Sequence, residues 1–330
     1  MLLFANMCIS FSYSREYKVL SNRTSVTHFV LLEVSGNREV QILYIILCLI
    51  TYVFILVENL LIILLVAASS YLHSPMYFFL INLSIGDLGC TSFIIPKSVF
   101  NTFMNSTWIS YSECGAQMFF ILFFLTTNLF ILTIMAYDRY IAICYPLHFA
   151  SIMKWSICLQ MAGWAWVIGF LHALLHTGNI FSMPFCSNTI NQLFCEVPQL
   201  IKLFCPGSYL NETWVLVFSS CLGVGCLSFI ILSYVWIFST VLRMPSVGRR
   251  EKAFSTCIPH LIVVSLFVGN SFLAHFAYLM PNFLPSLEEL CTILYTVVPS
   301  LMNPIIYSMK NKDVKVAFWK FLGWRHLDKK

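Results

Sequence analysis

The stretch QILYIILCLITYVFILVENLLIILLVAA, residues 41–68, decides the fold, because its only charged side chain is that of Glu58. A helix needs about 20 consecutive, mostly apolar residues to cross the hydrocarbon core of a bilayer. The stretch exceeds that length, and its apolar residues run continuously instead of alternating, which argues against a strand of a membrane barrel. It therefore predicts a membrane-spanning helix.

Further stretches of the same character follow along the chain, and together they predict a bundle of seven spans. The connecting segments are short and polar, except for a long one at 176–212. No internal repeat divides the bundle, so we expect one membrane domain at 41–309, preceded by an N-terminal segment, 1–40, and followed by a tail, 310–330. The predicted spans are 41–68, 76–99, 111–137, 155–175, 213–242, 253–279 and 290–309.

The composition supports this assignment and excludes other classes of protein. Hydrophobic residues make up 59% of the 330 residues, and charged residues make up only 10%. A soluble domain averages about 45–50% apolar and roughly 25% charged residues. A soluble enzyme, a disordered tail and a nucleic-acid-binding protein are therefore excluded.

The distribution of charge predicts the orientation in the membrane. With the N-terminus outside, thirteen of the 19 Lys and Arg residues lie on the cytoplasmic side, and eight acidic residues lie outside. Cytoplasmic segments of membrane proteins are enriched in Lys and Arg. We therefore expect a multi-pass plasma-membrane protein with an extracellular N-terminus and a cytoplasmic C-terminus.

The predicted outer side carries four cysteines, namely Cys114, Cys186, Cys195 and Cys205. Four cysteines allow three pairings, and the spacing alone does not choose among them. Three of them lie in one segment on the oxidising side, which favours disulfides over free thiols. Sequons for N-glycosylation also fall on this side, the one furthest from the bilayer being the best candidate. These sequons begin at Asn22, Asn105 and Asn211.

Polar residues within the predicted spans are functional candidates, because burying them in a membrane is costly. Asp87 lies in the middle of the second span, with Asn59 and Asn303 as candidate partners. The group is either a structural hydrogen-bonded cluster or a switch or cation site. Pro304 interrupts the seventh span, so the segment from Asn303 to Tyr307 is a candidate hinge. Residues 310–320 mix cations with apolar side chains, which is typical of a short helix in the inner interface.

Several motifs, in order and in the right spans, resemble the olfactory receptor family of rhodopsin-like G-protein-coupled receptors. The resemblance covers about residues 24–318. The motifs PMYFFL at 75–80 and KAFSTC at 252–257 are close to diagnostic of odorant receptors. Leu83-Ser84 with Asp87, Ser233-Tyr234 and His260 belong to the same pattern. The longer motifs are PMYFFL at 75–80, MAYDRYIAICYPLH at 135–148, KAFSTC at 252–257 and PSLMNPIIY at 299–307.

This resemblance implies an all-α membrane protein, a rhodopsin-like seven-transmembrane helix bundle with a short amphipathic helix after the seventh span. It implies the disulfides Cys114–Cys195 and Cys186–Cys205. The implied partners are a small-molecule odorant, membrane lipid and a heterotrimeric G protein of the olfactory stimulatory type, which raises cAMP. No cofactor, metal or nucleic acid is expected, and the chain is not expected to be an enzyme.

The resemblance also implies an activation machinery on the cytoplasmic side. Asp138 would hold Arg139 at rest and release it to meet the G protein, while Tyr234 and Tyr307 would swing inward to support the active state. The residues implied in coupling and activation are Asp87, Asp138, Arg139, Tyr140, Tyr234, Asn303, Pro304 and Tyr307.

Pockets of this superfamily open outward between the third, fifth, sixth and seventh spans, and helical spacing selects the residues that would line one here. Glu196, directly after Cys195, would form part of a lid. An apolar pocket with a few hydroxyls and no Lys or Arg at its depth favours a small neutral volatile ligand. The expected lining residues are Leu122, Leu125, Thr126, Glu196, Phe218, Ser219, Leu222, Ser271, Phe272, His275, Ile293 and Thr296.

The chain departs from the family pattern in three places. Val268 stands where the sixth span usually carries a Tyr, which removes a hydroxyl from the pocket floor. Asn128 stands where many relatives have Glu, so a cation site shared with Asp87 would be weaker. The N-terminus is longer than the family pattern, and the true start could lie nearer to Asn22.

Other functions of the same fold can be tested against the residues. An opsin needs a lysine in the seventh span, and an aminergic receptor an aspartate in the third; residues 290–309 and 111–137 lack them. A transporter or pump would show chains of intramembrane acids and bases, whereas the middle of the predicted spans carries only the acids Glu58 and Asp87. The alternative that the sequence leaves open is a chemosensory receptor for an endogenous metabolite outside the olfactory epithelium.

Overall fold

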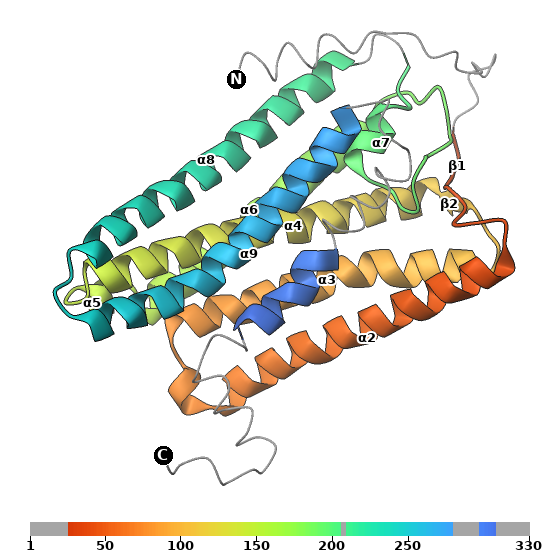
Figure 1. Ribbon diagram of the computed structural model, residues 1–330. Helices are drawn as coiled ribbons and strands as arrows, with labels where there is room; N and C mark the ends of the chain where they lie inside the picture. The colour runs from red at the N-terminus through yellow and green to blue at the C-terminus, as the bar shows by residue number, and fades with distance from the viewer. Residues whose placement is uncertain (1–25, 206–208, 280–296, 308–330) are drawn as a thin grey trace.

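The computed structural model describes residues 26–205, 209–279 and 297–307, with side chains for all of these except 71, 209–213 and 270–279. Long helices lie side by side along most of the molecule (Figure 1). In chain order the elements are β1 His28–Val30, α2 Arg38–Ala68, η1 Ser70–Leu72, α3 Pro75–Phe103, β2 Trp108–Ser110, α4 Tyr111–Cys144, α5 Phe149–Ile152, α6 Trp155–Phe181, α7 Val197–Ile201, α8 Tyr209–Leu242, α9 Val247–Leu279 and a last helix, Val297–Tyr307.

The described helices confirm the predicted seven-helix membrane fold. Within the described ranges, α2, α3, α4, α6, α8 and α9 are each long and apolar enough to cross a membrane. The helix Val297–Tyr307 is shorter and apolar, and it lies within the predicted seventh span. The amphipathic helix expected after that span lies outside the described residues.

The helices extend beyond the apolar runs that predicted them. The fourth span was expected to end at residue 175, but α6 continues to Phe181. The long segment that follows it therefore begins at Ser182, and its predicted start at His176 is wrong. His176 is 3% exposed, and its imidazole is hydrogen-bonded to Ser219 on α8. This hydrogen bond offsets part of the cost of burying a polar side chain inside the bundle.

The core of the bundle forms around α4, which packs against α3, α6 and α8. The largest buried cluster lies between these helices and the last helix, and it includes Leu83, Ile131, Tyr234 and Tyr307. A second cluster lies at the other end of α4, where Phe29 is fully buried against Tyr111 and Phe181. The bundle is therefore closed by buried side chains at both ends of its central helix.

A short antiparallel sheet, which the sequence did not predict, forms at the N-terminal end of α4. Residue Phe29 of β1 pairs with Ile109 of β2, and Val30 N–H donates to the carbonyl of Asn188 at 2.7 Å. Both strands and α7 lie together at this end in Figure 1. The segment that precedes α2 is thus attached to the long loop between α6 and α8.

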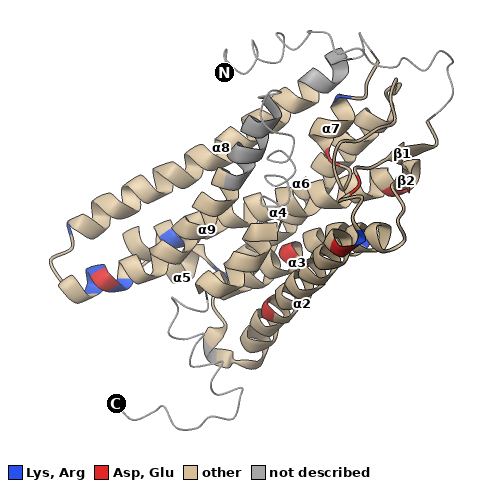
Figure 2. Cartoon of the chain, turned by 45° about the vertical axis from the view of Figure 1, so that its right-hand side comes forward, with Lys and Arg blue, Asp and Glu red and all other residues tan. Residues whose placement is uncertain are grey.

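The outward faces of the long helices are apolar. Leu43, Trp164 and Trp214 are 57%, 65% and 74% exposed within predicted spans. Figure 2 shows long uncharged stretches along the helices, with most charged residues near the two ends. Large exposed apolar side chains between charged ends are typical of a surface that contacts lipid.

Candidate functional site

Asp87 lies at the centre of a buried polar cluster inside the bundle. Its side chain is 1% exposed, and Asn303 Nδ2 donates to its Oδ2 at 2.8 Å. Asn128 Nδ2 donates to its Oδ1 at 2.9 Å, and Ser300 Oγ donates to the same oxygen at 3.4 Å. The cluster thus links α3, α4 and the helix Val297–Tyr307, which contains Pro304.

Asn59, the other expected partner of Asp87, reaches the cluster indirectly. Its Nδ2 donates to the backbone carbonyl of Ser300 at 3.1 Å and to that of Ile55 at 3.0 Å. Asn128 also determines how closely α3 and α4 approach, because a Cβ added to Gly86 would overlap its side-chain amide. Asn128 is therefore both a donor to Asp87 and a steric partner of Gly86.

Asp138 and Arg139 form a buried ion pair near the C-terminal end of α4, the end that leads into α5. Arg139 Nε donates to Asp138 Oδ2 at 3.0 Å, and its Nη2 donates to the same oxygen. The Asp138 side chain is fully buried, and that of Arg139 is 13% exposed. Breaking a buried pair by removing one partner costs about 3–5 kcal/mol, because a charge is left uncompensated.

His260 joins three helices next to this pair, a role that the sequence reasoning missed. Its Nε2 donates to the carbonyl of Leu132 at 3.0 Å, and its Nδ1 lies 2.7 Å from the hydroxyl of Tyr234. A carbonyl only accepts, so Nδ1 carries the lone pair and Tyr234 is the donor. Tyr307 is 1% exposed, and its hydroxyl has no hydrogen-bond partner among the described residues.

Tyr140, by contrast, lies apart from this group. Its ring packs against that of Tyr145 with the centroids 5.6 Å apart, and the two hydroxyls are 3.5 Å apart. Of the residues expected to act in coupling, the structure therefore brings Asp138, Arg139 and Tyr234 to one end of the bundle. It places Tyr140 on the neighbouring surface.

The opposite end is held by disulfides. Cys114, in the first turn of α4, is bonded to Cys195, and Cys186 is bonded to Cys205. Glu196 follows Cys195, is 5% exposed and directly precedes α7. The segment expected to act as a lid is therefore fixed to the end of α4 through Cys195.

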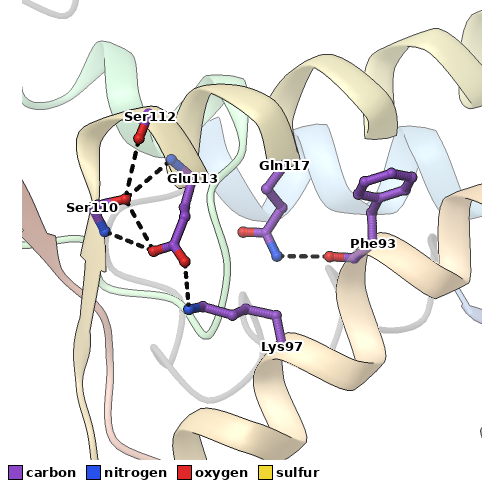
Figure 3. Close-up of polar contacts among 6 residues, drawn as sticks. All are labelled: Phe93, Lys97, Ser110, Ser112, Glu113 and Gln117. Atoms are coloured by element: carbon purple, nitrogen blue, oxygen red, sulfur yellow. Dashed lines mark hydrogen bonds and ion pairs between the residues drawn. The ribbon is translucent and has the colours of Figure 1, made fainter.

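Gln117, a further residue that the sequence reasoning missed, connects this segment to α3. Its Oε1 accepts the backbone N–H of Cys195 at 2.9 Å, and its Nε2 donates to the carbonyl of Phe93 at 2.9 Å. One turn away, Lys97 and Glu113 form an ion pair at 3.3 Å, and Glu113 also accepts the N–H of Ser110 (Figure 3). A search for polar residues inside apolar spans would have found Gln117 and His260.

The expected pocket residues fall into different environments. Leu122 packs on the cluster of Phe29, whereas Leu125 packs on a separate cluster with Ile121. Thr126 and Ser219 are not free hydroxyls, because both are hydrogen-bonded to His172 on α6. Phe218 is 53% exposed on α8, and Leu222 is half-buried. The side chains of Ser271, Phe272, His275, Ile293 and Thr296 lie outside the described residues.

The sequons are described only in part. Asn105 follows the end of α3 with a φ of 54°, and its Oδ1 accepts a hydrogen bond from Gln41 Nε2 at 2.9 Å. Asn211 lies in the first turn of α8, where side chains are not described, and Asn22 lies outside the described residues.

A seven-helix bundle with a polar cluster at its centre, an Asp-Arg pair at one end and a disulfide-fixed loop at the other defines a membrane receptor with the rhodopsin fold. The structure matches that of squid rhodopsin with a TM-score of 0.69 at 18% sequence identity, over 86% of each chain. At this identity the likeness supports the fold alone.

The family follows from the sequence comparisons. The pattern of the olfactory receptor family matches residues 47–324. The chain is 43% identical to human (Homo sapiens) Olfactory receptor 14C36, over 92% of this chain and 97% of that one. It is 44% identical to human Olfactory receptor 14I1, over 91% and 97%. The chain belongs to the olfactory receptor family, and it is a receptor that binds a small molecule and couples to a G protein, not an enzyme.

Proposed function

We propose that this receptor binds a small, neutral, volatile odorant in the outer half of the bundle and activates the olfactory stimulatory G protein to raise cAMP. The observation that carries the proposal is the buried Asp138–Arg139 pair beside the Tyr234–His260 hydrogen bond. Both contacts are polar and non-covalent, so they can exchange partners when α9 moves away from α4. Released in this way, Arg139 would contact the G protein.

The test is a cAMP assay in cells that express the receptor with this G protein. We expect Arg139→Ala to reduce the maximal response by about tenfold or more, because it removes the only guanidinium of the pair. Arg38→Ala is the matched control, since Arg38 is exposed at the opposite end and donates to Gln41 at 2.9 Å. An odorant response that survives Arg139→Ala at equal surface amount would contradict the proposed switch.

The proposal of a neutral ligand rests on the charges near the expected pocket. Lys97 lies at the disulfide-bonded end and is paired with Glu113 at 3.3 Å, so its charge is already compensated. The expected lining of α4 and α8 contributes leucines, a phenylalanine and hydroxyls. We expect neutral odorants to activate at lower concentration than carboxylic acids. A carboxylic acid as the most potent agonist would contradict this part of the proposal.

The proposed orientation places the N-terminal segment, 1–40, outside and the tail, 310–330, in the cytoplasm, with the receptor domain 41–309 between them in the plasma membrane. Two disulfides lie at the end that carries β1, and disulfides form on the oxidising side of a membrane. The basic tail would contact anionic lipid, and Asn22 would carry a glycan. Antibody labelling of an N-terminal tag in intact cells, and of a C-terminal tag only after permeabilisation, tests this orientation.

A further inference from the structure

Two histidines on adjacent turns of α6 connect the hydroxyls expected to line the pocket. The Nδ1 atom of His172 lies 2.9 Å from Thr126 Oγ1, and its Nε2 lies 2.9 Å from Ser219 Oγ. His176 Nε2 lies 2.6 Å from the same Ser219 oxygen, and the two imidazole centroids are 4.8 Å apart. One chain of hydrogen bonds therefore runs from α4 through α6 to α8.

The position of each proton in this chain follows from what the groups can donate. Ser219 Oγ lies 2.8 Å from the carbonyl of Val215, which can only accept, so the single hydroxyl proton goes there. Both lone pairs of Ser219 then accept the Nε2–H groups of His172 and His176. A neutral imidazole protonated at Nε2 has its lone pair at Nδ1. Thr126 must therefore donate its proton to His172 Nδ1.

This arrangement leaves the two hydroxyls with different capacities. Ser219 has donated its proton and filled both lone pairs, so it has nothing to offer a ligand. Thr126 has given up its proton and keeps only lone pairs, so it can accept a hydrogen bond but cannot donate one. His172 is half-buried, and both its ring nitrogens are already engaged with Thr126 and Ser219.

We infer that Thr126 acts as a fixed hydrogen-bond acceptor, which selects ligands with a hydroxyl donor, such as alcohols and phenols, over ethers, ketones and esters of the same skeleton. This inference rests on the proposed function, in which the odorant lies in the outer half of the bundle against α4. Thr126 is 7% exposed and His176 3% exposed, so little water can replace a missing partner. An ether or carbonyl oxygen at this site would meet lone pairs instead of a proton, and unpaired buried acceptors are costly.

The experiment compares compounds that differ only in this donor. The probes are straight-chain alcohols and substituted phenols, each with its methyl ether and, for the alcohols, the aldehyde of the same chain length. The readout is the ratio of half-maximal concentrations for cAMP between the ether or aldehyde and the alcohol or phenol. We expect the donor compound to be about five- to tenfold more potent, as one hydrogen bond predicts.

Three variants separate the acceptor from a merely structural role. Thr126→Val removes the acceptor, so we expect the ratio to fall to about one. Thr127→Val is the matched control, since the hydroxyl of Thr127 donates to the carbonyl of Phe123 at 2.8 Å within α4; its ratio should equal that of the wild type. His172→Phe frees the Thr126 proton to point at the ligand, so aldehydes and ethers should gain potency relative to alcohols. A structural role of His172 would weaken all compounds alike. The amount at the surface is measured for every variant.

The outcomes distinguish this inference from the proposed function. Responses in which ethers and aldehydes equal or exceed the alcohols in the wild type contradict the inference and leave the proposed function standing. An unchanged ratio in Thr126→Val does the same. A receptor that reaches the surface and raises cAMP with none of these compounds contradicts both the proposed function and the inference that rests on it.

Discussion

The two ends of the bundle are held by different kinds of bond. At the end of β1 and β2, disulfides fix the loop to α4 and close the loop on itself, and Gln117 ties it to α3. At the other end, α4, α8 and α9 are held by the hydrogen bonds of His260, beside the Asp138–Arg139 pair. Within the described residues, every disulfide therefore lies at the end that carries β1 and β2. This end is the one proposed to lie outside, and it is called the outer end below, the other being the inner end.

This difference in bonding distinguishes an end whose conformation is fixed from an end whose conformation can change. A covalent bond persists in every conformation of the receptor, whereas a hydrogen bond or an ion pair can change partners at a cost of a few kcal/mol. Two-state switching requires a free-energy difference of this size. The outer end is thus suited to hold a pocket in constant shape, and the inner end is suited to open.

The largest effect is expected from removal of the disulfide between the first turn of α4 and the long loop. Cys114→Ala opens a link between residues 81 positions apart, and such a loss costs about 2–5 kcal/mol. We expect surface amount and odorant response both to fall by about tenfold or more. Cys48→Ala, at a half-buried free cysteine of α2, is the control and should behave as wild type. A normal response from Cys114→Ala would show that the outer end needs no covalent frame.

The next effect comes from the inner end, where the variant should activate instead of inactivating. Asp138→Asn removes the charge that holds Arg139, so the resting state loses part of the roughly 3–5 kcal/mol associated with a buried pair. We expect ligand-independent cAMP to rise several-fold. Glu113→Gln breaks the outer ion pair as a control and should leave basal cAMP unchanged. An equal rise in both variants would contradict the division between the ends.

A smaller rise in basal cAMP is expected from His260→Leu. The variant removes two hydrogen bonds, to the Leu132 carbonyl and to Tyr234, each worth about 1 kcal/mol. Basal cAMP per receptor at the surface should rise less than in Asp138→Asn. His73→Leu, at an exposed histidine after η1, is the control. Unchanged basal cAMP would mean that His260 does not restrain the resting state.

The smallest effect is expected at the exposed ion pair of the outer end. The side chains of Lys97 and Glu113 are 29% and 51% exposed, and exposed pairs contribute about 0–1 kcal/mol. Lys97→Met should therefore change the potency of a neutral odorant by no more than about twofold. A large loss of potency would indicate that Lys97 contacts the ligand directly, which would also contradict the proposed preference for neutral compounds.

Much of the fold was predictable, because each membrane span is a long apolar run and the segments that connect the spans are more polar. The errors lie where polar residues belong to the bundle. His176 was predicted to begin a loop, since the sequence does not show that Ser219 on another helix is hydrogen-bonded to it. The strand at His28–Val30 was missed because three residues carry no periodic pattern, and its partner lies far along the chain.

The candidate site was predictable where it contains an ionisable side chain that is costly to bury in a membrane. Asp87 in a span needs partners, and Asn303, which was expected, is one of them. A histidine in a span can be found in the same way, but the sequence does not reveal which groups it bonds. The roles of His172 and His260 depend on atoms contributed by other helices, so they required coordinates.

The close contact between Gly86 and Asn128 has a consequence for the evolution of this receptor. A Cβ at Gly86 would overlap the Asn128 amide, and that amide also donates to Asp87. An alanine at position 86 would therefore displace the Asn128 amide from Asp87 unless position 128 had first acquired a smaller side chain. A substitution at one of these positions thus changes the cost of a substitution at the other, so the order in which the two positions change matters.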